Sequence, residues 1–192
     1  MLKPECIQPV TLEKSWRILN HGPTVWVASA HGGKQNVMAA AWCMPLDYHP
    51  PRLVVIIDKN SLTSALVAAS GEFVIAVPAA DQAQLTLQIG NSSGRDTDKF
   101  VRYGIDAFAA QKVTAPLPAG CLAWLECRVV CEPHVQQTYD MVIGEIVAAS
   151  ADSAVYSKDR WHFPDKERTS VHYVSGGFFF RTGEGFVVEN EA

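Results

Sequence analysis

The pattern of hydrophobic and polar positions predicts a chain built mostly from short strands. Runs of β-branched, aromatic and other apolar residues are separated by turn signals, which is typical of strands. The predicted strands cover residues 24–30, 36–44, 52–58, 72–77, 122–130, 141–149 and 178–181. His31-Gly32-Gly33-Lys34 joins the first two as a hairpin turn, because glycine is free to adopt positive φ. Pro45 and the Pro50-Pro51 pair mark the end of the second strand, since proline cannot donate to a sheet ladder.

Short helices are predicted between some of these strands, over residues 62–70, 79–89 and 96–103. Asn60 or Ser61 is a suitable N-cap for the first helix, and Gly71 closes it. The segment 151–170 is polar and aromatic with little periodicity, so it is predicted to be a long loop. It is a candidate lid with Trp161 as a cover, or alternatively a packed excursion.

These elements predict a mainly β fold, a β-barrel with short helices, because closure into a barrel removes exposed sheet edges. The 192 residues contain no repeat, linker or low-complexity tract, so we expect a single domain over residues 1–192 with a core at about 15–185.

Composition excludes several classes of protein. Hydrophobic residues make up 48% and charged residues 19%, as in globular proteins. The net charge is −4 and the cations are scattered, so we expect no nucleic-acid partner. The longest apolar stretches fall far short of the ~18–20 residues of a membrane span, so we expect no membrane partner.

The five cysteines are odd in number and irregularly spaced, and we expect no signal peptide, because the first residues lack an apolar run. This pattern indicates reduced thiols and a cytoplasmic location. Cys127 and Cys131, four apart on a predicted strand, are expected to share a face as core thiols and not as a zinc pair.

Familiar catalytic and nucleotide motifs are missing from the sequence. It contains no Gly-x-Gly-x-x-Gly after a strand, no phosphate-binding loop, no His-Glu-x-x-His helix and no Gly-x-Ser-x-Gly elbow. We therefore predict no metal site and no catalytic side-chain constellation.

One candidate segment is the predicted helix start at residues 60–63. The first turn of a helix has unpaired N–H groups and a positive dipole end, which favour a phosphate. The hydroxyls of Ser61 and Thr63 could donate to the same oxygens. Alternatively, these residues only cap the helix.

A second candidate is the cation pair Arg95 and Lys99, which lie four apart and point to one side if they are helical. Two cations can neutralise a dianionic phosphate. Alternatively, they form a solvated surface with Asp96 and Asp98 as local partners.

A third candidate is the strand 36–44, whose small residues Ala39, Ala40 and Ala41 let a flat ring lie close to the backbone. Trp42 could stack on such a ring. A tightly packed strand crossing would use small residues in the same way. Flavin mononucleotide (FMN) is one ligand that needs all three segments at once.

Several motifs, taken in order, resemble the flavin reductase-like family, and most closely its flavoredoxin-type proteins. The motifs are Asn36…Trp42, Pro50-Pro51, Asn60-Ser-x-Thr63, Gly71-Glu-Phe73, Ser93-Gly-Arg-Asp-x-Asp-Lys-Phe100, Leu125-Glu-Cys127, Gly144-Glu-Ile-Val147 and His172-x-x-x-Gly176-Gly177-x-Phe179. Each motif is weak alone, but together they span roughly residues 15–185.

The resemblance implies an FMN-binding split β-barrel that forms a homodimer, with FMN near the subunit interface. It places Asn36 and Trp42 at the isoalloxazine ring, and Thr63 and Lys99 at the phosphate end. Ser61 and Arg95 are implied as neighbours of that end. His172 or Tyr173 is implied near the flavin from the C-terminal region.

The chain departs from the family pattern at one position. Many relatives carry Gly-Asp-His before the strand that contains Gly144-Glu145, where this chain has Gln137-Thr138-Tyr139. In such relatives the histidine is associated with flavin and nicotinamide contact. Tyr139 keeps a ring and a hydroxyl but cannot become a cation, which bears on NAD(P)H use more than on FMN binding.

The expected function is an FMN-binding oxidoreductase of the flavin reductase type, with NADH or NADPH as transient electron donor. An alternative is a flavoredoxin-type electron carrier that a redox protein partner reduces. A further alternative is a split-barrel dimer that has lost its flavin. The presence of Thr63, Arg95 and Lys99, the residues implied at the phosphate end, argues against this alternative.

Overall fold

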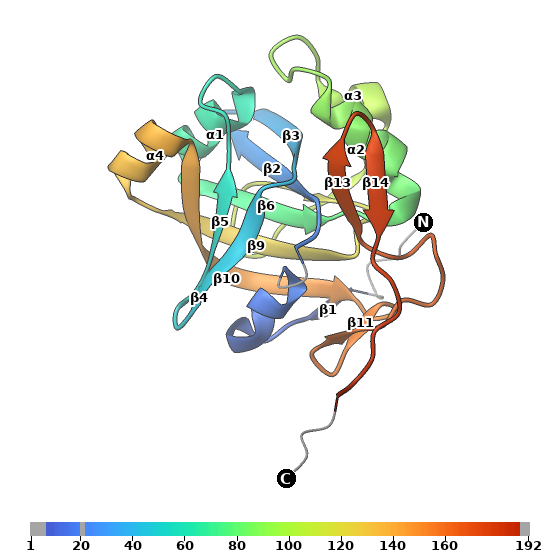
Figure 1. Ribbon diagram of the computed structural model, residues 1–192. Helices are drawn as coiled ribbons and strands as arrows, with labels where there is room; N and C mark the ends of the chain where they lie inside the picture. Colours follow the sequence, from blue (N-terminus) through green and yellow to red (C-terminus); the bar gives the residue numbers. More distant parts are fainter. Residues whose placement is uncertain (1–6, 20–21, 189–192) are drawn as a thin grey trace.

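An antiparallel sheet forms the centre of the molecule (Figure 1). In this computed structural model, which describes residues 7–19 and 22–188, its strands are β1 (Ile7–Pro9), β2 (Val25–His31), β3 (Lys34–Ala40), β4 (Cys43–Tyr48), β5 (Pro51–Ile56), β6 (Glu72–Val77), β9 (Ala123–Val130) and β10 (Met141–Asp152). Their order is β3-β2-β6-β9-β10-β5-β4, and β1 also pairs with β10. The strands at the two ends of this order, β3 and β4, are consecutive in the chain, so the sheet curls back toward itself. The mainly β barrel prediction is confirmed.

Short helices pack around this sheet. They are η2 (Leu12–Ile18), α1 (Leu62–Ser70), η3 (Ala80–Gln82), α2 (Ala83–Gly90), α3 (Lys99–Tyr103) and α4 (Pro133–Tyr139). The bounds of α1 are those predicted: the Ser61 hydroxyl accepts from the Ser64 N–H at 3.0 Å, and Gly71 ends the helix at φ 71°. The helix predicted at 96–103 begins only at Lys99, because the Asp98 carboxylate caps the N–H groups of Phe100 and Val101. Within the described residues, no helix is long and apolar enough to cross a membrane.

Three small hairpins complete the fold. They are β7 (Ala107–Phe108) with β8 (Leu117–Pro118), β11 (Tyr156–Ser157) with β12 (Arg160–Trp161), and β13 (Val171–Ser175) with β14 (Phe178–Arg181). Much of the predicted loop 151–170 is therefore structured, since it contains the end of β10 and the β11–β12 hairpin. Trp161 packs in it against Tyr156, with ring centroids 5.2 Å apart.

Alternate residues of the central strands belong to two different cores. In β2, Val25 and Val27 join the inner core of the barrel, whereas Trp26 and Ala28 join an outer core beneath α2 and the segment 105–117. The strands β6 and β9 alternate in the same way. Burial on both faces explains why these strands appear in the sequence as continuous apolar runs.

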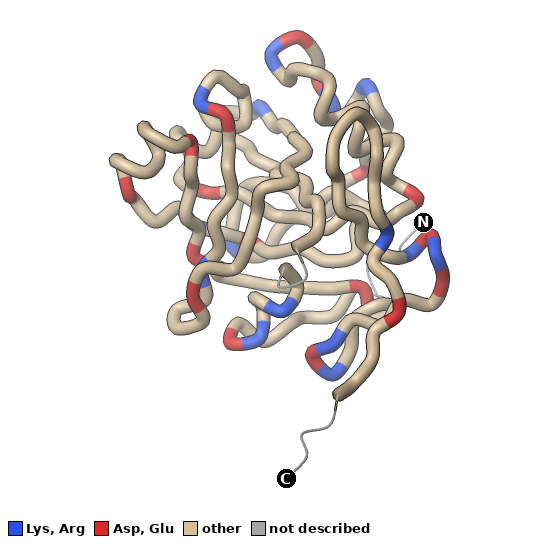
Figure 2. Tube along the Cα trace, viewed as in Figure 1, with Lys and Arg blue, Asp and Glu red and all other residues tan. Residues whose placement is uncertain are grey.

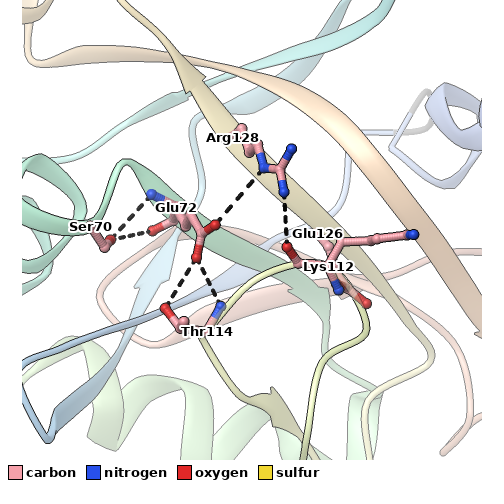
Figure 3. Close-up of polar contacts among 6 residues, drawn as sticks. All are labelled: Ser70, Glu72, Lys112, Thr114, Glu126 and Arg128. Atoms are coloured by element: carbon pink, nitrogen blue, oxygen red, sulfur yellow. Dashed lines mark hydrogen bonds and ion pairs between the residues drawn. The ribbon is translucent and has the colours of Figure 1, made fainter.

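Polar contacts fix part of the segment that covers the outer core (Figure 3). Buried Glu126 on β9 accepts from the Lys112 N–H at 2.6 Å and the Gln111 N–H at 3.0 Å. Glu72 on β6 accepts from the N–H and the hydroxyl of Thr114 at 2.9 and 3.1 Å. Two neighbouring strands thus hold this segment through carboxylates, which bind N–H donors more strongly than neutral acceptors do.

Two sequence expectations about strands are wrong. The strand predicted at 36–44 is two strands, β3 and β4, and the chain turns between them at Ala41 and Trp42. The β4 strand continues through Pro45 because β4 lies at the edge of the sheet, where a missing N–H is tolerated, and its register shifts after Pro45. Cys131 does not share a buried face with Cys127, because β9 ends at Val130 and the Cys131 thiol is exposed.

Candidate cofactor site

Asn36 on β3 lies where three segments meet. Its side-chain amide donates a hydrogen bond of 2.8 Å to the Thr63 hydroxyl on α1, and both side chains are buried. A Cβ atom at position 94 would collide with the Asn36 amide, so any other residue there would force Asn36 to move. The buried Oδ1 atom of Asn36 has no hydrogen-bond partner among the described residues. The structure therefore joins β3, the start of α1 and the segment 91–98 around one amide.

Arg95 links the same two loops from outside. Its Nε donates to the Asn60 carbonyl at 3.1 Å and its Nη2 to the Ser61 carbonyl at 3.4 Å, and the side chain is exposed. The Ser61 hydroxyl caps α1, as expected from the alternative in which this residue serves as the helix cap. Arg95 and Lys99 do not lie on one helix, because α3 begins at Lys99. Arg95 nevertheless brings a cation to the N-terminal end of α1.

Lys99 is a buried cation. Its side chain is 3% exposed, and its ammonium group donates to the Ile89 carbonyl at the end of α2 at 2.9 Å. In the part of the chain that the structure describes, no carboxylate lies within 4.0 Å of this ammonium. Burial lowers the pKa of Lys99 to about 8. A buried ammonium without a counter-charge favours binding of an anion.

A pocket of about 240 Å³, here called the ring pocket, lies at the other end of β3. Its lining consists of Thr24, Ala39, Ala40, Ala41, Thr86, Leu87, Gly90, Asn91, Tyr173 and Phe179. None of these side chains is charged. The Thr86 hydroxyl is used within the protein, since it accepts from the Trp26 indole at 2.9 Å and donates to the Gln82 carbonyl at 2.9 Å. A neutral, mostly apolar lining of this size suits a flat uncharged ring.

The β13–β14 hairpin supplies an aromatic wall of the ring pocket. Tyr173 and Phe179 are cross-strand partners whose ring centroids lie 5.1 Å apart. The Tyr173 N–H donates to the buried Thr24 hydroxyl at 2.7 Å, which holds the hairpin against β2. The neighbouring residue, His172, instead places its imidazole 3.1 Å from the Thr182 hydroxyl. Of the two C-terminal candidates, Tyr173 lines the pocket.

Two other predicted residues lie outside this lining. Trp42 follows Ala41 directly and is 74% exposed. Tyr139 ends α4 with its ring 6.2 Å from that of His134, and the following Asp140 carbonyl accepts from the Ile57 N–H. Tyr139 therefore lies near the connection between β5 and α1. Among the described residues, no cluster of histidine, cysteine, aspartate and glutamate could hold a metal.

Sequence reasoning missed six lining residues of the pocket, which are Thr24, Thr86, Leu87, Gly90, Asn91 and Phe179. Thr24 and Leu87 carry no local motif, so nothing in the sequence indicated that they face β3. Phe179 stood in a quoted motif, and pairing across the Gly176-Gly177 turn could have placed it opposite Tyr173.

The arrangement suits an elongated ligand with an anionic end and a flat ring. Asn36 and Ala40 lie four residues apart on β3, or roughly 13 Å at ~3.3 Å per residue. One strand thus leads from the segments that carry Arg95 and Lys99 to the neutral ring pocket. The buried Lys99 ammonium fits a phosphate, the neutral lining fits a flat ring, and the unpartnered Asn36 oxygen can accept a hydrogen bond from an O–H or N–H group of such a ligand.

Comparison with known proteins shows the family to which the chain belongs. The family model of the flavin reductase like domain matches residues 17–170. The chain belongs to the flavin reductase-like family. An FMN-binding domain of a flavin reductases-like enzyme from Shewanella baltica OS155 superimposes with a TM-score of 0.92, at 42% identity, over 95% of this chain and 97% of that one.

Two further proteins are similar to this chain. The uncharacterized protein YddH of Escherichia coli K12 is 38% identical over 179 residues, which is 92% of this chain and 95% of YddH. Flavoredoxin of Desulfovibrio vulgaris (Miyazaki F) superimposes with a TM-score of 0.76 at 22% identity, covering 87% of this chain and 90% of flavoredoxin. That likeness shows a shared fold, the split β-barrel of flavin reductase-like proteins.

Proposed function

We propose that this protein binds FMN and acts as an oxidoreductase that passes electrons through it. The observation that carries the proposal is the course of β3, which connects the cation-bearing segments around Asn36 with the uncharged ring pocket. FMN has a matching shape, with a phosphate at one end and a flat isoalloxazine ring at the other. The FMN-binding relative from Shewanella baltica supports the same ligand.

Each end of the site would hold a different part of FMN. Lys99, Arg95 and the first turn of α1 at Ser61 would hold the phosphate. Thr63 would position Asn36 and the helix start, because its hydroxyl is buried against the Asn36 amide. The ring would lie against the backbone at Ala40 and Ala41, whose small side chains allow close approach.

When bound, FMN supplies the redox chemistry, and the chain supplies its position and surroundings. We propose NADH or NADPH as electron donor, which makes the protein an NAD(P)H-dependent flavin reductase-like enzyme. The second candidate is an FMN electron carrier reduced by a protein partner. Tyr139 favours that candidate, because it stands where the family resemblance implies a histidine associated with flavin and nicotinamide contact, and tyrosine cannot become a cation near neutral pH.

We also propose that two copies of the chain form a homodimer through β4. Trp42 and the β4 residues Met44, Leu46 and Tyr48 form an exposed apolar row along this strand, each between 48% and 74% exposed, and the register shift after Pro45 lies within it. An apolar row on an edge strand is a ready surface for a second chain. Since Trp42 follows the ring pocket residue Ala41, the second copy would lie close to the flavin ring.

A visible absorption spectrum tests the proposal directly. The purified protein is loaded with FMN, desalted, and then treated with NADH or NADPH without oxygen. Retained bands near ~370 and ~450 nm, the usual flavin absorbance, are expected. Bleaching by either nicotinamide identifies the reductase, and bleaching only by a reduced protein partner identifies the carrier. A colourless protein after loading would refute both flavin functions.

A further inference from the structure

A second and larger hollow, here called the C-terminal hollow, lies between the β11–β12 hairpin and the C-terminal segment 182–188. Figure 1 shows this segment running past the hairpin toward the C-terminus. The hollow has a volume of about 1360 Å³ and includes residues of β12, β14 and the segment 182–188 in its lining. Phe179 lines both this hollow and the ring pocket. A molecule in the hollow would therefore lie one side chain away from the ring pocket.

Aromatic rings form one wall of the C-terminal hollow. Trp161 and Phe163 stack with ring centroids 5.5 Å apart and an interplanar angle of 23°. Both are partly buried against the inner core of the barrel, which holds the stack in place. Flat ligands gain affinity by packing against such fixed aromatic faces.

The charged residues of the hollow favour an anion. Arg160, Lys166 and Arg181 line it, and no described carboxylate lies within 4.0 Å of their charged groups. The carboxylates that line it are Asp165 and Glu184. The Asp165 carboxylate is held in its own turn, where it accepts from the N–H groups of residues 167 and 168 at 2.8 Å. Cations thus outnumber carboxylates here, although the whole chain carries a net charge of −4, and Figure 2 shows residues of both signs along the trace.

We propose that the C-terminal hollow binds a second ligand, a planar aromatic molecule that carries a phosphate. The Trp161–Phe163 stack would pack on its ring, and Arg160 and Arg181 would hold its phosphate. Nucleotides and free flavin mononucleotide share this chemistry. The position next to Phe179 suits the electron donor or acceptor of the flavin; this role rests on the proposed function, whereas the binding site does not.

Calorimetric titration of the full chain, saturated with FMN beforehand, tests the site. The probes are adenosine monophosphate against adenosine, and further FMN against riboflavin, because each pair differs only in the phosphate. We expect the phosphate-bearing probe to bind more tightly in at least one pair. Tighter binding of adenosine monophosphate than of adenosine identifies a nucleotide ligand. Tighter binding of FMN than of riboflavin identifies a flavin ligand. Binding of no probe at about 1 mM, or equal affinities within both pairs, would overturn the proposal.

Charge variants locate the binding in the hollow. Arg160→Gln and Arg181→Gln should each lower the affinity for the phosphate-bearing probe by up to about fivefold, which is the scale of an exposed ion pair. The affinity for the uncharged probe should not change. Glu184→Gln should strengthen binding of the phosphate-bearing probe by a similar factor, a gain that a folding defect cannot produce. Lys34→Gln, at the exposed β2–β3 turn, is the matched control and should have no effect.

The outcomes separate this site from the proposed function. If the charge variants bind every probe as the wild type does, the hollow is not the site, while retention of the first FMN equivalent would still support the flavin function. If the wild type retains no FMN, the titration with adenosine monophosphate still decides whether the hollow binds a planar phosphate. Trp161→Leu tests the stacking, since it should lower the affinity for the phosphate-bearing probe and for its uncharged counterpart alike.

Discussion

The side-chain amide of Asn36 donates a hydrogen bond of 2.8 Å to the Thr63 hydroxyl, and neither residue is more than 3% exposed. This bond joins β3 to α1 over a separation of 27 residues. Because β3 also lines the ring pocket and α1 begins at Ser61, the bond sets the position of the predicted phosphate end relative to the ring.

Thr63→Val should lower the free energy of unfolding by about 1–3 kcal/mol. Valine has a similar shape but cannot accept a hydrogen bond, so the buried Asn36 amide loses its partner. Urea denaturation measures the change. The control is Thr138→Val on the exposed face of α4, which should change stability by no more than about 0.5 kcal/mol. Equal stability of the two variants would show that the Asn36–Thr63 bond contributes nothing.

Lys99 should make stability depend on pH in the alkaline range. Burial lowers its pKa from 10.5 to about 8, so the folded state releases this proton before the unfolded state does. Below pH 8, Lys99 is charged in both the folded and the unfolded state, so burial of its charge lowers stability in full. Between pH 8 and 10.5 the folded state loses this charge first, so the free energy of unfolding rises with pH. Relative to Lys99→Met, the wild type should gain up to about 3 kcal/mol on going from pH 7 to pH 10.5.

Urea denaturation of both proteins across this pH range measures the gain, with Lys34→Met as an exposed control that should follow the wild type. A constant difference between the wild type and Lys99→Met would contradict the prediction. FMN adds an independent readout, because its phosphate would keep Lys99 protonated. FMN affinity should therefore fall above pH 8 in the wild type and stay level in Lys99→Met.

The parts of the fold that follow from local signals were predictable from the sequence. The helix α1 begins and ends as predicted, because its N-cap Ser61 and C-cap Gly71 lie within the segment itself. The strand β6 matches as well, since Glu72–Val77 is apolar after its first residue and a proline follows. In both cases the decisive interactions lie within a few residues.

The parts that depend on distant contacts were not predictable in detail. Nothing near Asn36 shows that its amide meets Thr63 and Gly94, which a barrel brings together from separate connections. The choice of Tyr173 over His172 as a lining residue depends on which face of β13 turns toward β3. The late start of α3 depends on a single cap, Asp98, in a segment with several suitable residues.

Breaking the ion pair between Arg168 and Asp152 should destabilise the fold strongly. The Arg168 Nη2 lies 2.7 Å from the Asp152 Oδ2, and the Asp152 side chain is 3% exposed. Arg168→Met leaves that carboxylate buried without its cation, which costs about 3–5 kcal/mol. The control is Arg52→Met. The Arg52 guanidinium lies 3.9 Å from the Glu145 carboxylate, and both side chains are more than a third exposed. This variant should lower the free energy of unfolding by less than about 1 kcal/mol.

Urea denaturation of both arginine variants decides this prediction. The Arg168 guanidinium also donates to the Gly120 carbonyl at 3.0 Å, so Arg168→Lys should restore only part of the loss, because lysine lacks the two-pronged geometry. Equal effects of Arg168→Met and Arg52→Met would mean that the buried pair adds no more stability than the exposed one.

A charge on β4 should separate the proposed dimer. Sedimentation of the wild type should give about twice the chain mass of 21.0 kDa. Met44→Glu places an unpaired charge in the middle of the apolar row, at a cost of roughly 3 kcal/mol, so the dimer dissociation constant should rise more than a hundredfold. The control is Val101→Glu on α3, where an apolar residue of 78% exposure lies outside the row.

The same variants test whether the dimer completes the flavin site. If the second copy lies beside the ring, as the position of Trp42 next to Ala41 favours, Met44→Glu should lose FMN on desalting while Val101→Glu retains it. A wild-type monomer that holds FMN would refute the interface. A monomeric Met44→Glu variant that binds FMN as tightly as the wild type would show that one chain alone forms the whole site.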